Sequence, residues 1–254
     1  MWKPNVQRTV RDQLVLALGL IPAISVNTKI IANPRRASPT TAEFDLVAPF
    51  YPGLERLVFG THLDDTRQAF LLEILEANQV LLVGEGNGRF LKLLNTREFA
   101  GQVRVVEKSS MMIRLAKNHV GSLGKAGVEF VQGDFRRCQL GRGFDCVVTH
   151  FFLDLFNPPA QLAIIEKFAE LTDEMATWIN VDFIPARSWR GRVLMWWQYR
   201  FFRVVSRIEA KSCSDELPAA LQSGWSLVEA VPYLGGLVVA RRYRKASRNN
   251  NICE

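Results

Sequence analysis

The chain has 254 residues and a formal net charge of +7 at pH 7, with 48% hydrophobic and 22% charged residues. This length suits one α/β domain with short additions and requires no second domain. The composition is that of a globular protein, and no apolar run reaches the roughly 18 residues that a membrane-spanning helix needs. The positive charge admits nucleic acid, anionic lipid and acidic metabolites as partners without selecting among them.

The cysteines and histidines give no sign of a disulfide framework or a metal site. None of the four cysteines follows CxxC spacing, so we expect free thiols in a reducing compartment. The three histidines lie far apart in the sequence and lack the spacing of metal ligands. The sequence therefore predicts no bound metal.

The N-terminal segment combines basic residues with the apolar run Leu14–Ile24. Such a run resembles the core of a signal peptide, and Ala23-Ile24-Ser25 would serve as a cleavage site. Pro22 interrupts the run and further charge follows it, which favours an amphipathic or peripheral helix. The Pro-, Ser- and Thr-rich stretch Asn33–Thr41 is typical of a linker. We therefore expect residues 1–41 to form an N-terminal extension and linker.

Helical and strand patterns alternate in the rest of the chain, so we expect one main domain over residues 42–245 and a disordered tail at 246–254. Apolar residues at helical spacing predict two or three helices between Glu43 and Ala77. Five β-rich runs follow, at Gln79–Gly84, Gln102–Glu107, Val128–Gln132, Phe144–Thr149 and Thr177–Phe183. Helical patterns separate them, at Arg89–Phe99, Ser110–Leu123 and Ala160–Leu171.

The order of these elements predicts the fold class. Strands that alternate with helices imply a parallel sheet with helices on both faces. Near the end, Ser226–Pro232 and Leu237–Arg244 flank Gly235-Gly236, a pattern that indicates an antiparallel hairpin. We expect an α/β fold whose mostly parallel sheet ends in that hairpin.

A glycine-rich turn, Gly84-Glu85-Gly86-Asn87-Gly88, joins the first β-rich run to a helix that begins near Arg89. Alternating glycines let the backbone turn sharply and approach a ligand closely. A dinucleotide fingerprint would need a third glycine where this chain has Arg89. The spacing therefore disfavours NAD and favours S-adenosylmethionine (SAM), although a purely structural turn fits the same pattern.

Two further strand ends carry side chains that suit an adenosyl group. Glu107 ends the second run, at about the 20-residue spacing at which a carboxylate accepts ribose hydroxyls. Asp134 and Phe135 follow the third run and offer a carboxylate for an adenine amino group and a ring to pack on the base. A solvated glutamate and a simple Gly-Asp turn are the structural alternatives. Because ligands of open α/β sheets bind at the carboxyl ends of strands, we interpret the three strand ends as one cofactor site.

These segments resemble the motifs of the class I SAM-dependent methyltransferases, over about Phe44 to Arg244. VLLVGEGNGRF matches the first motif, VEKSSMMIRLA the second, VQGDF the third and FDCVVTHFFLDLF the fourth. The resemblance implies a Rossmann-like fold with a seven-stranded sheet, SAM as cofactor, and Met112 near the adenine. It implies the following cofactor-binding residues: Gly84, Glu85, Gly86, Asn87, Gly88, Glu107, Lys108, Met112, Asp134, Phe135 and Thr149.

The resemblance has one departure and one looser extension. Leu82 stands where many family members have an acidic residue two positions before the first glycine. We expect Glu85 to supply that carboxylate for the methionine portion of SAM. The segment FDLVAPFYPGLERLVFG is similar to the start of the ubiquinone and menaquinone C-methyltransferases, where this region helps cover the substrate.

Methyl transfer from a sulfonium is an in-line displacement in which alignment alone supplies about 7–11 kcal/mol of the barrier. A base is optional, although a phenol, quinol or enol acceptor would benefit from one. His150 and Asp154, just beyond the fourth strand, are the candidate catalytic residues. A hydrogen-bonded structural histidine, and an aspartate that caps a helix or pairs with an arginine, are the alternatives.

The segment Arg187–Arg207 combines arginine and aromatic residues without any acid. Their spacing predicts an amphipathic basic helix, which would be a lid over a lipophilic acceptor, a contact with anionic membrane, an RNA-binding face or an ordinary cover of the sheet. The aromatic content favours a small, lipophilic or quinone- or phenol-like acceptor. We expect a cytoplasmic or membrane-peripheral methyltransferase, with an RNA or protein methyltransferase and a non-catalytic SAM-binding scaffold as alternatives.

Overall fold

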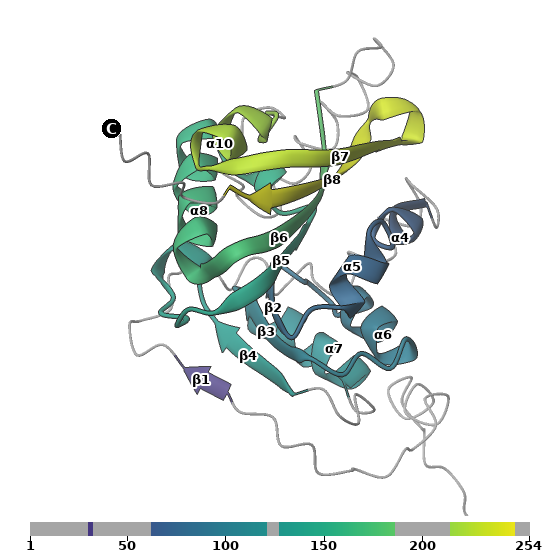
Figure 1. Cartoon of the computed structure of the whole chain (residues 1–254). Helices are drawn as coiled ribbons and strands as arrows, with labels where there is room; N and C mark the ends of the chain where they lie inside the picture. The colour runs from purple at the N-terminus through teal and green to yellow at the C-terminus, as the bar shows by residue number, and fades with distance from the viewer. Residues whose placement is uncertain (1–29, 33–61, 121–126, 186–213, 247–254) are drawn as a thin grey trace, which may run out of the picture.

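The structure is a computed structural model of the chain that describes residues 30–32, 62–120, 127–185 and 214–246 (Figure 1). Within these residues the strands form one sheet in the order β1-β4-β3-β2-β5-β6-β8-β7. The strands are β1 (Ile30–Ala32), β2 (Gln79–Val83), β3 (Gln102–Glu107), β4 (Val128–Gln132), β5 (Phe144–His150), β6 (Thr172–Phe183), β7 (Trp225–Tyr233) and β8 (Val238–Lys245).

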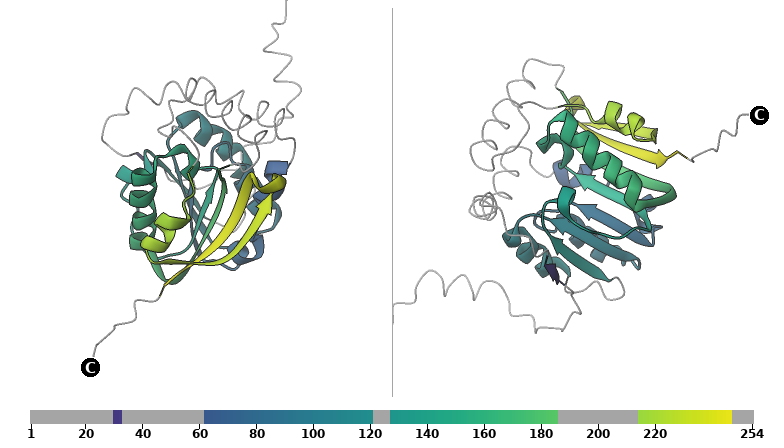
Figure 2. Two further views of the ribbon diagram at one scale, coloured as in Figure 1. Left: turned by 90° about the horizontal axis from the view of Figure 1, so that it is seen from above. Right: turned by 90° about the vertical axis from the view of Figure 1, so that its left-hand side faces the viewer.

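Helices cover both faces of the sheet, with α4 to α7 on one side and α8 and α10 on the other (Figures 1 and 2). The α-helices are α4 (His62–Thr66), α5 (Leu71–Leu75), α6 (Arg89–Thr96), α7 (Ser110–Val120), α8 (Pro158–Leu171) and α10 (Leu217–Gln222). Three short 3-10 turns are η1 (Phe135–Arg137), η2 (Leu153–Leu155) and η3 (Leu234–Gly236).

The central strand β2 is buried on both faces of the sheet, which explains why its sequence is continuously apolar. Val80 and Leu82 belong to the core cluster under α5, α6 and α7, whereas Leu81 and Val83 belong to the cluster under α8 and α10. All four side chains are 0% exposed. A parallel strand that is buried on both faces needs apolar residues at every position, because successive side chains point to opposite faces.

The expected α/β fold with a mostly parallel sheet is confirmed. The seven strands β2 to β8 follow the predicted order, and β8 pairs antiparallel with both β6 and β7. Gly235 and Gly236 in the hairpin turn have φ angles of 63° and 84°, which glycine adopts without strain. The three-residue strand β1 adds an eighth member beside β4, inside the segment that we expected to be extension and linker.

The sixth strand is longer than the sequence predicts. It begins at Thr172 and not at Thr177. The sequence pattern missed the first residues because those directly after Thr172 are exposed and show no apolar alternation. Met175 there has a φ of 64° and is 56% exposed. The strand pattern starts only where the side chains enter the core.

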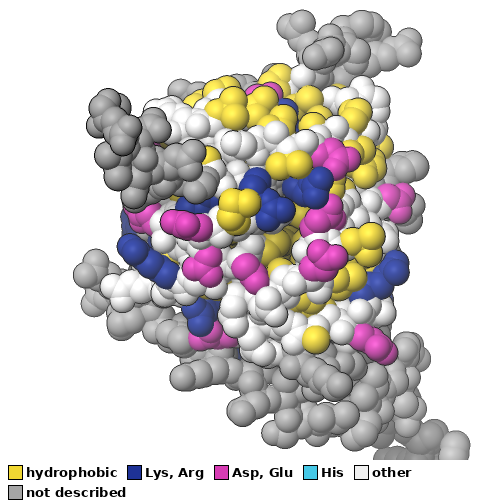
Figure 3. All heavy atoms as spheres, viewed as in Figure 1, with side chains coloured by type: hydrophobic (Ala, Val, Ile, Leu, Met, Phe, Trp, Pro, Cys, Tyr) yellow, Lys and Arg dark blue, Asp and Glu magenta, His cyan; other side chains and the backbone are white. Residues whose placement is uncertain are grey.

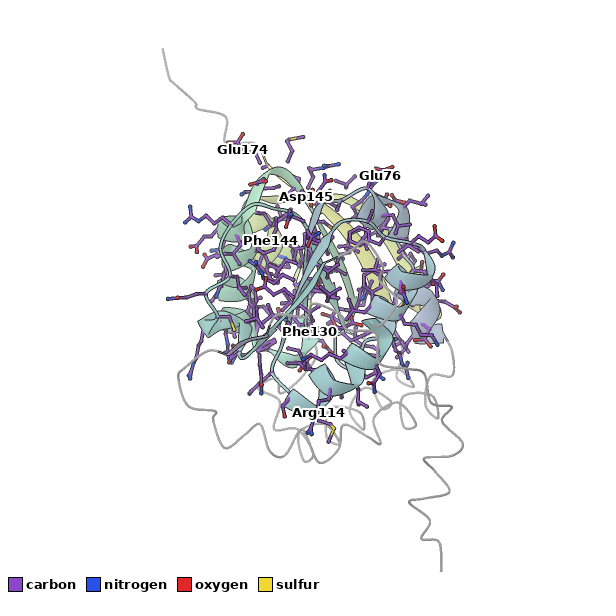
Figure 4. All side chains as sticks on the ribbon, turned by 90° about the horizontal axis from the view of Figure 1, so that it is seen from below. Glu76, Arg114, Phe130, Phe144, Asp145 and Glu174 are labelled. Carbon is purple, nitrogen blue, oxygen red and sulfur yellow. The ribbon has the colours of Figure 1, made fainter. Side chains whose placement is uncertain are left out.

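The amino and carboxyl edges of the sheet differ in character. At the amino edge, the carboxylate of Asp145 accepts hydrogen bonds from the backbone N–H groups of Asn78 and Gln79 at 2.8 and 2.9 Å, which fixes the start of β2. Figure 4 shows Asp145 on the same side as Phe144 and Glu76, with Arg114 of α7 on the opposite side.

The described helices include none that is long and apolar enough to cross a membrane.

Candidate cofactor and acceptor site

The candidate site lies at the carboxyl edge, where β2, β3 and β5 end side by side. In the parallel register, Val83 faces Val106 on one side and Thr149 on the other. The glycine-rich loop follows Val83 directly, so it sits between the ends of β3 and β5. This is the edge at which open α/β sheets bind ligands.

The glycine-rich loop needs glycine for two different reasons. Gly84, Gly86 and Gly88 have φ angles of 73°, 67° and 88°, a region that other L-residues rarely adopt. A Cβ atom at Gly84 would lie 2.4 Å from the ring of Phe152, and one at Gly88 would lie 2.5 Å from Cα of Ala116 on α7. A Cβ atom at Gly86 would meet no atom within 4 Å. The loop is therefore packed at both ends and open to a ligand in the middle.

Glu107 is tied to this loop by its carboxylate. Oε2 accepts a hydrogen bond from the backbone N–H of Gly86 at 3.0 Å, and Oε1 accepts one from the backbone N–H of Ser109 at 2.8 Å. The residue is only 9% exposed, so the two bonds fix the carboxylate in place. A carboxylate oxygen has more than one acceptor direction, and ribose hydroxyls can still donate to it. The predicted proximity of Glu107 and the glycine loop is present; the ribose contact stays a prediction.

Glu85 has a role that the sequence analysis did not foresee. Its Oε1 atom accepts hydrogen bonds from the backbone N–H groups of Phe90 and Leu91 at 2.8 and 3.2 Å. The carboxylate thus caps the N-terminus of α6, where unpaired N–H groups favour an anion. Burial nevertheless raises the pKa of Glu85 to about 7. One oxygen is committed to the helix, so the predicted contact with the methionine portion of SAM falls to Oε2.

Asp134 and Phe135 turn away from each other after β4. Asp134 caps η1 by accepting a hydrogen bond from the backbone N–H of Arg136 at 3.0 Å, and the Arg136 side chain also binds both carboxylate oxygens. Phe135 is 3% exposed and packs on Phe168 of α8 with ring centroids 5.1 Å apart. The ring is thus packed in the core beside α8, and its contact with an adenine stays a prediction.

Thr149 also faces the core. Its hydroxyl donates to Oδ1 of Asn180 at 2.7 Å and accepts from Nε1 of Trp178 at 2.9 Å. Asn180 in turn donates to the buried carboxylate of Glu216 at 2.8 Å. The hydroxyl is thus part of a buried polar network under α10, and a contact between Thr149 and SAM stays a prediction.

The other predicted cofactor residues divide by exposure. Lys108 is exposed directly beyond β3, and Asn87 is partly buried in the glycine loop. Met112 is 2% exposed, and its backbone N–H donates to the hydroxyl of Ser109 at the start of α7. These positions leave their predicted contacts as expectations.

The candidate base His150 lies at the end of β5 and is only 6% exposed. Its ring meets the edge of Phe90 with centroids 4.7 Å apart, and neither ring nitrogen has a hydrogen-bond partner in the structure. Burial, followed by the charge of Arg67, lowers the pKa of His150 to about 3. An imidazole with such a pKa is neutral at physiological pH and is a weak base.

Asp154 forms a pair with Asp182, a residue that the sequence analysis missed. Oδ2 of Asp182 accepts hydrogen bonds from the backbone N–H groups of Leu153 and Asp154 at 2.9 and 3.2 Å, and the two aspartate side chains hydrogen-bond to each other. The residues are 6% and 2% exposed. Burial, and then the charge of Asp154, raise the pKa of Asp182, so the pair keeps a proton. The sequence did contain a signal for Asp182, because an acidic residue near the end of an otherwise apolar strand is unusual.

A pair of arginines borders the site from the side of α4. Oδ1 of Asp64 accepts hydrogen bonds from Nη1 of Arg67 and Nη1 of Arg89, both at 3.1 Å. The guanidinium of Arg67 lies over the ring of Phe151, 4.9 Å from its centroid. Phe151 directly follows β5 and has a φ of 54°, a strained value for an aromatic residue.

The described residues contain no group of three or more His, Cys, Asp or Glu side chains arranged to hold a metal ion. Two of the four cysteines, Cys138 and Cys146, are described, and both are buried free thiols. The predicted basic helix at Arg187–Arg207 and the segment FDLVAPFYPGLERLVFG lie outside the residues that the structure describes. On the face shown in Figure 3, the described acidic and basic side chains intermingle.

Comparison with known proteins agrees with this geometry. Residues 80–174 match the family model described as a methyltransferase domain. The middle of this chain is therefore similar to a methyltransferase domain. The matched segment contains the glycine loop, Glu107, Asp134 and the end of β5, which are the parts that form the candidate site. No curated protein matches the chain.

Solved structures of methyltransferases share the fold. A SAM-dependent methyltransferase from Methanosarcina mazei aligns with a TM-score of 0.52 and 16% identity, over 70% of this chain and 97% of its own. The N-methyltransferase NodS from Bradyrhizobium japonicum aligns with a TM-score of 0.53 and 13% identity, over 73% and 97%. An O-methyltransferase family 2 protein from Planctomyces limnophilus, in complex with apigenin, aligns with a TM-score of 0.60 and 12% identity, over 84% and 63%. These likenesses show that the chain shares the fold of these methyltransferases.

Proposed function

We propose that this protein transfers a methyl group from SAM to a small acceptor with an apolar, quinone- or phenol-like body. The observation that carries the proposal is the hydrogen bond between Glu107 and the N–H of Gly86, which joins the open part of the glycine loop to the ribose-binding candidate. We assign the catalytic domain to residues 42–245. SAM, when bound, supplies a methyl group on a positively charged sulfur.

The residues at the carboxyl edge have the shape and chemistry to hold SAM. Gly86 leaves open space for close approach, Glu107 can accept the ribose hydroxyls, and the carboxylate of Asp134 can accept an adenine amino group. Oε2 of Glu85 can accept a hydrogen bond from the ammonium group of the methionine portion. These residues orient the methyl group, and alignment alone is worth about 7–11 kcal/mol of the barrier.

The acceptor class is inferred from the aromatic residues that follow β5 and end β6. Phe151 and Phe183 have ring centroids 5.2 Å apart, and Phe152 and Phe156 have centroids 5.0 Å apart. Phe152 also packs on Gly84 of the cofactor loop. Aromatic rings beside the cofactor loop favour a flat, apolar acceptor. The apigenin complex of the Planctomyces protein supports a small-molecule acceptor.

Two measurements test the proposal. Calorimetric titration of the full chain should show micromolar binding of SAM and no binding of NAD, because Arg89 replaces the third glycine of a dinucleotide site. NAD binding without SAM binding would contradict the proposal. A methyl-label transfer assay with phenols, quinols, lipid extract and RNA should then label the phenol or quinol fraction; label that enters only RNA would refute the proposed acceptor class.

A further inference from the structure

His150 is a buried polar side chain whose hydrogen-bonding capacity is unused. Both ring nitrogens lack a partner in the structure, although the residue is only 6% exposed. A buried nitrogen without a hydrogen-bond partner is destabilising, and such groups are rare in folded proteins. The explanation that fits a residue at a ligand-binding edge is a hydrogen bond to the ligand.

A cation stands close to this imidazole. The side chain of Arg67 is 13% exposed, and its guanidinium lies 4.9 Å from the ring centroid of Phe151, the residue that follows His150. Its charge also acts on His150 and Glu85. Arg67 and Arg89 share one carboxylate, that of Asp64. A partly buried guanidinium favours an anionic partner.

The strand register places His150, and with it Arg67, beside the glycine loop. Val83 pairs with Thr149, so Gly84 and His150 follow next to each other at the ends of β2 and β5. Arg67 lies over the ring of Phe151, the next residue after His150. The strained φ of 54° at Phe151 holds that ring under the guanidinium.

We propose that Arg67 and His150 form a binding site for an anionic oxygen, with Arg67 supplying the charge and His150 a neutral imidazole N–H. The inference rests on the proposed methyltransferase function. The oxygen belongs either to the carboxylate of the methionine portion of SAM or to an ionised hydroxyl of the acceptor.

The second source would change how the acceptor is activated. An acceptor that binds as an oxyanion has already released its proton to solvent and needs no strong base. Its oxygen lone pair forms the new O–CH3 bond while the S–CH3 bond breaks and the sulfur keeps the bonding electrons. The low basicity of His150 then suits its function, because a neutral imidazole can donate a hydrogen bond without competing for the proton.

One experimental arm examines the cofactor carboxylate. S-adenosylhomocysteine carries the amino-acid portion, whereas 5′-methylthioadenosine lacks it. If the carboxylate occupies the site, Arg67→Gln should reduce the affinity for S-adenosylhomocysteine by about tenfold or more and leave that for 5′-methylthioadenosine unchanged. Arg67→Lys keeps the charge and should recover part of the loss.

The other arm examines the acceptor oxyanion. 4-Nitrophenol is added to the protein saturated with S-adenosylhomocysteine, at a pH at which the free phenol is mostly protonated. If the site takes an oxyanion, the bound phenol should show the visible absorption of its phenolate. Arg67→Gln and His150→Phe should lose that signal by about tenfold, whereas the exposed Arg142→Gln should behave as wild type.

The outcomes separate the possibilities. A change in the first arm assigns the site to the cofactor carboxylate, and a change in the second assigns it to the acceptor. If Arg67→Gln and His150→Phe match the wild type in both arms while remaining folded by thermal unfolding, the inference is wrong. If the wild type binds neither S-adenosylhomocysteine nor 5′-methylthioadenosine, the proposed function itself fails.

Discussion

The carboxylate of Glu107 accepts a hydrogen bond from the backbone N–H of Gly86 at 3.0 Å, so the end of β3 holds the open part of the cofactor loop. Glu107→Ala should therefore remove a ribose acceptor and loosen the loop together. We expect SAM affinity to fall by about 1.5–3 kcal/mol, the scale of hydrogen bonds to a charged group. Calorimetry should show this loss, with the exposed Glu76→Ala as a control. An unchanged dissociation constant in a folded Glu107→Ala protein would place the ribose elsewhere.

Arg136 keeps the carboxylate of Asp134, the residue that we propose binds the adenine, in its ionised form. Burial disfavours the charged carboxylate, but hydrogen bonds from Arg136 outweigh it and hold the pKa of Asp134 below its usual value. Lys108 and Lys167 are the other cations near this carboxylate. Because Asp134 stays ionised, it remains an acceptor as the pH falls, until the pH approaches its lowered pKa.

Arg136→Gln should raise the pKa of Asp134 and move the acid loss of SAM binding to higher pH. The pair is partly exposed, so the folding free energy should change by no more than about 1 kcal/mol. SAM dissociation constants measured between about pH 3 and 6 would show the shift. Identical acid limbs for the wild type and the variant would mean that Asp134 does not bind the cofactor.

The Asp154–Asp182 pair should make stability depend on pH. Its raised pKa means that the folded protein holds a proton which the unfolded chain releases above about pH 4. The stabilisation is complete below that pH and is lost as the pH rises through the folded pKa. Asp154→Asn supplies a permanent donor to Asp182, so urea unfolding should lose this pH dependence.

The corresponding substitution of Asp182 distinguishes the roles of the two aspartates. Asp182 accepts hydrogen bonds from backbone N–H groups of Leu153, Asp154 and Phe183. Asp182→Asn removes one acceptor oxygen from these amides, so it should destabilise the protein by about 1–3 kcal/mol at every pH. Equal unfolding free energies for Asp154→Asn and Asp182→Asn would show that the two positions are equivalent.

His150 should have the opposite pH dependence. Its pKa falls from 6.5 to about 3 on folding, so the unfolded chain binds more protons between these values. Stability should therefore rise with pH across this window, and His150→Phe should remove that contribution. Because the variant also eliminates two unsatisfied nitrogens, we expect it to unfold at equal or higher urea concentration than the wild type at neutral pH. A marked loss of stability would reveal a structural hydrogen bond to His150.

The sequence predicts the bounds of β3 and β4 well because β-branched and aromatic residues are concentrated within them. The bounds of β3 and β4 agree with the runs Gln102–Glu107 and Val128–Gln132. The glycine loop and Glu107 could be paired in advance because parallel strands end at one edge.

Side-chain direction at the strand ends could not be predicted in the same way. Thr149 and His150 are adjacent, yet one faces the core under α8 and α10 and the other meets Phe90 of α6. Alternation alone does not say which of two neighbours reaches the ligand. Asp182 was missed because its partner Asp154 lies on another element, and the capping role of Glu85 depends on where α6 begins. β1 is too short to leave a pattern.

The insertion of β8 between β6 and β7 has a consequence for how the chain folds. β6 pairs with β5 on one side, but its other edge is covered only when the far segment Val238–Lys245 arrives. Until then, the side chains of Trp178, Ile179 and Val181, which end with no exposure, flank a row of open backbone groups. Such an edge invites pairing between molecules.

In the completed sheet the edge strand is β7, whose sequence disfavours pairing between molecules. β7 contains Pro232, which lacks an N–H group, and its register with β8 is interrupted between Leu227 and Glu229. Refolding should thus be limited by the long-range closure of residues 238–245 onto β6, and association should compete with it at high protein concentration. The hairpin that completes the sheet also ends the period in which this chain is most prone to aggregate.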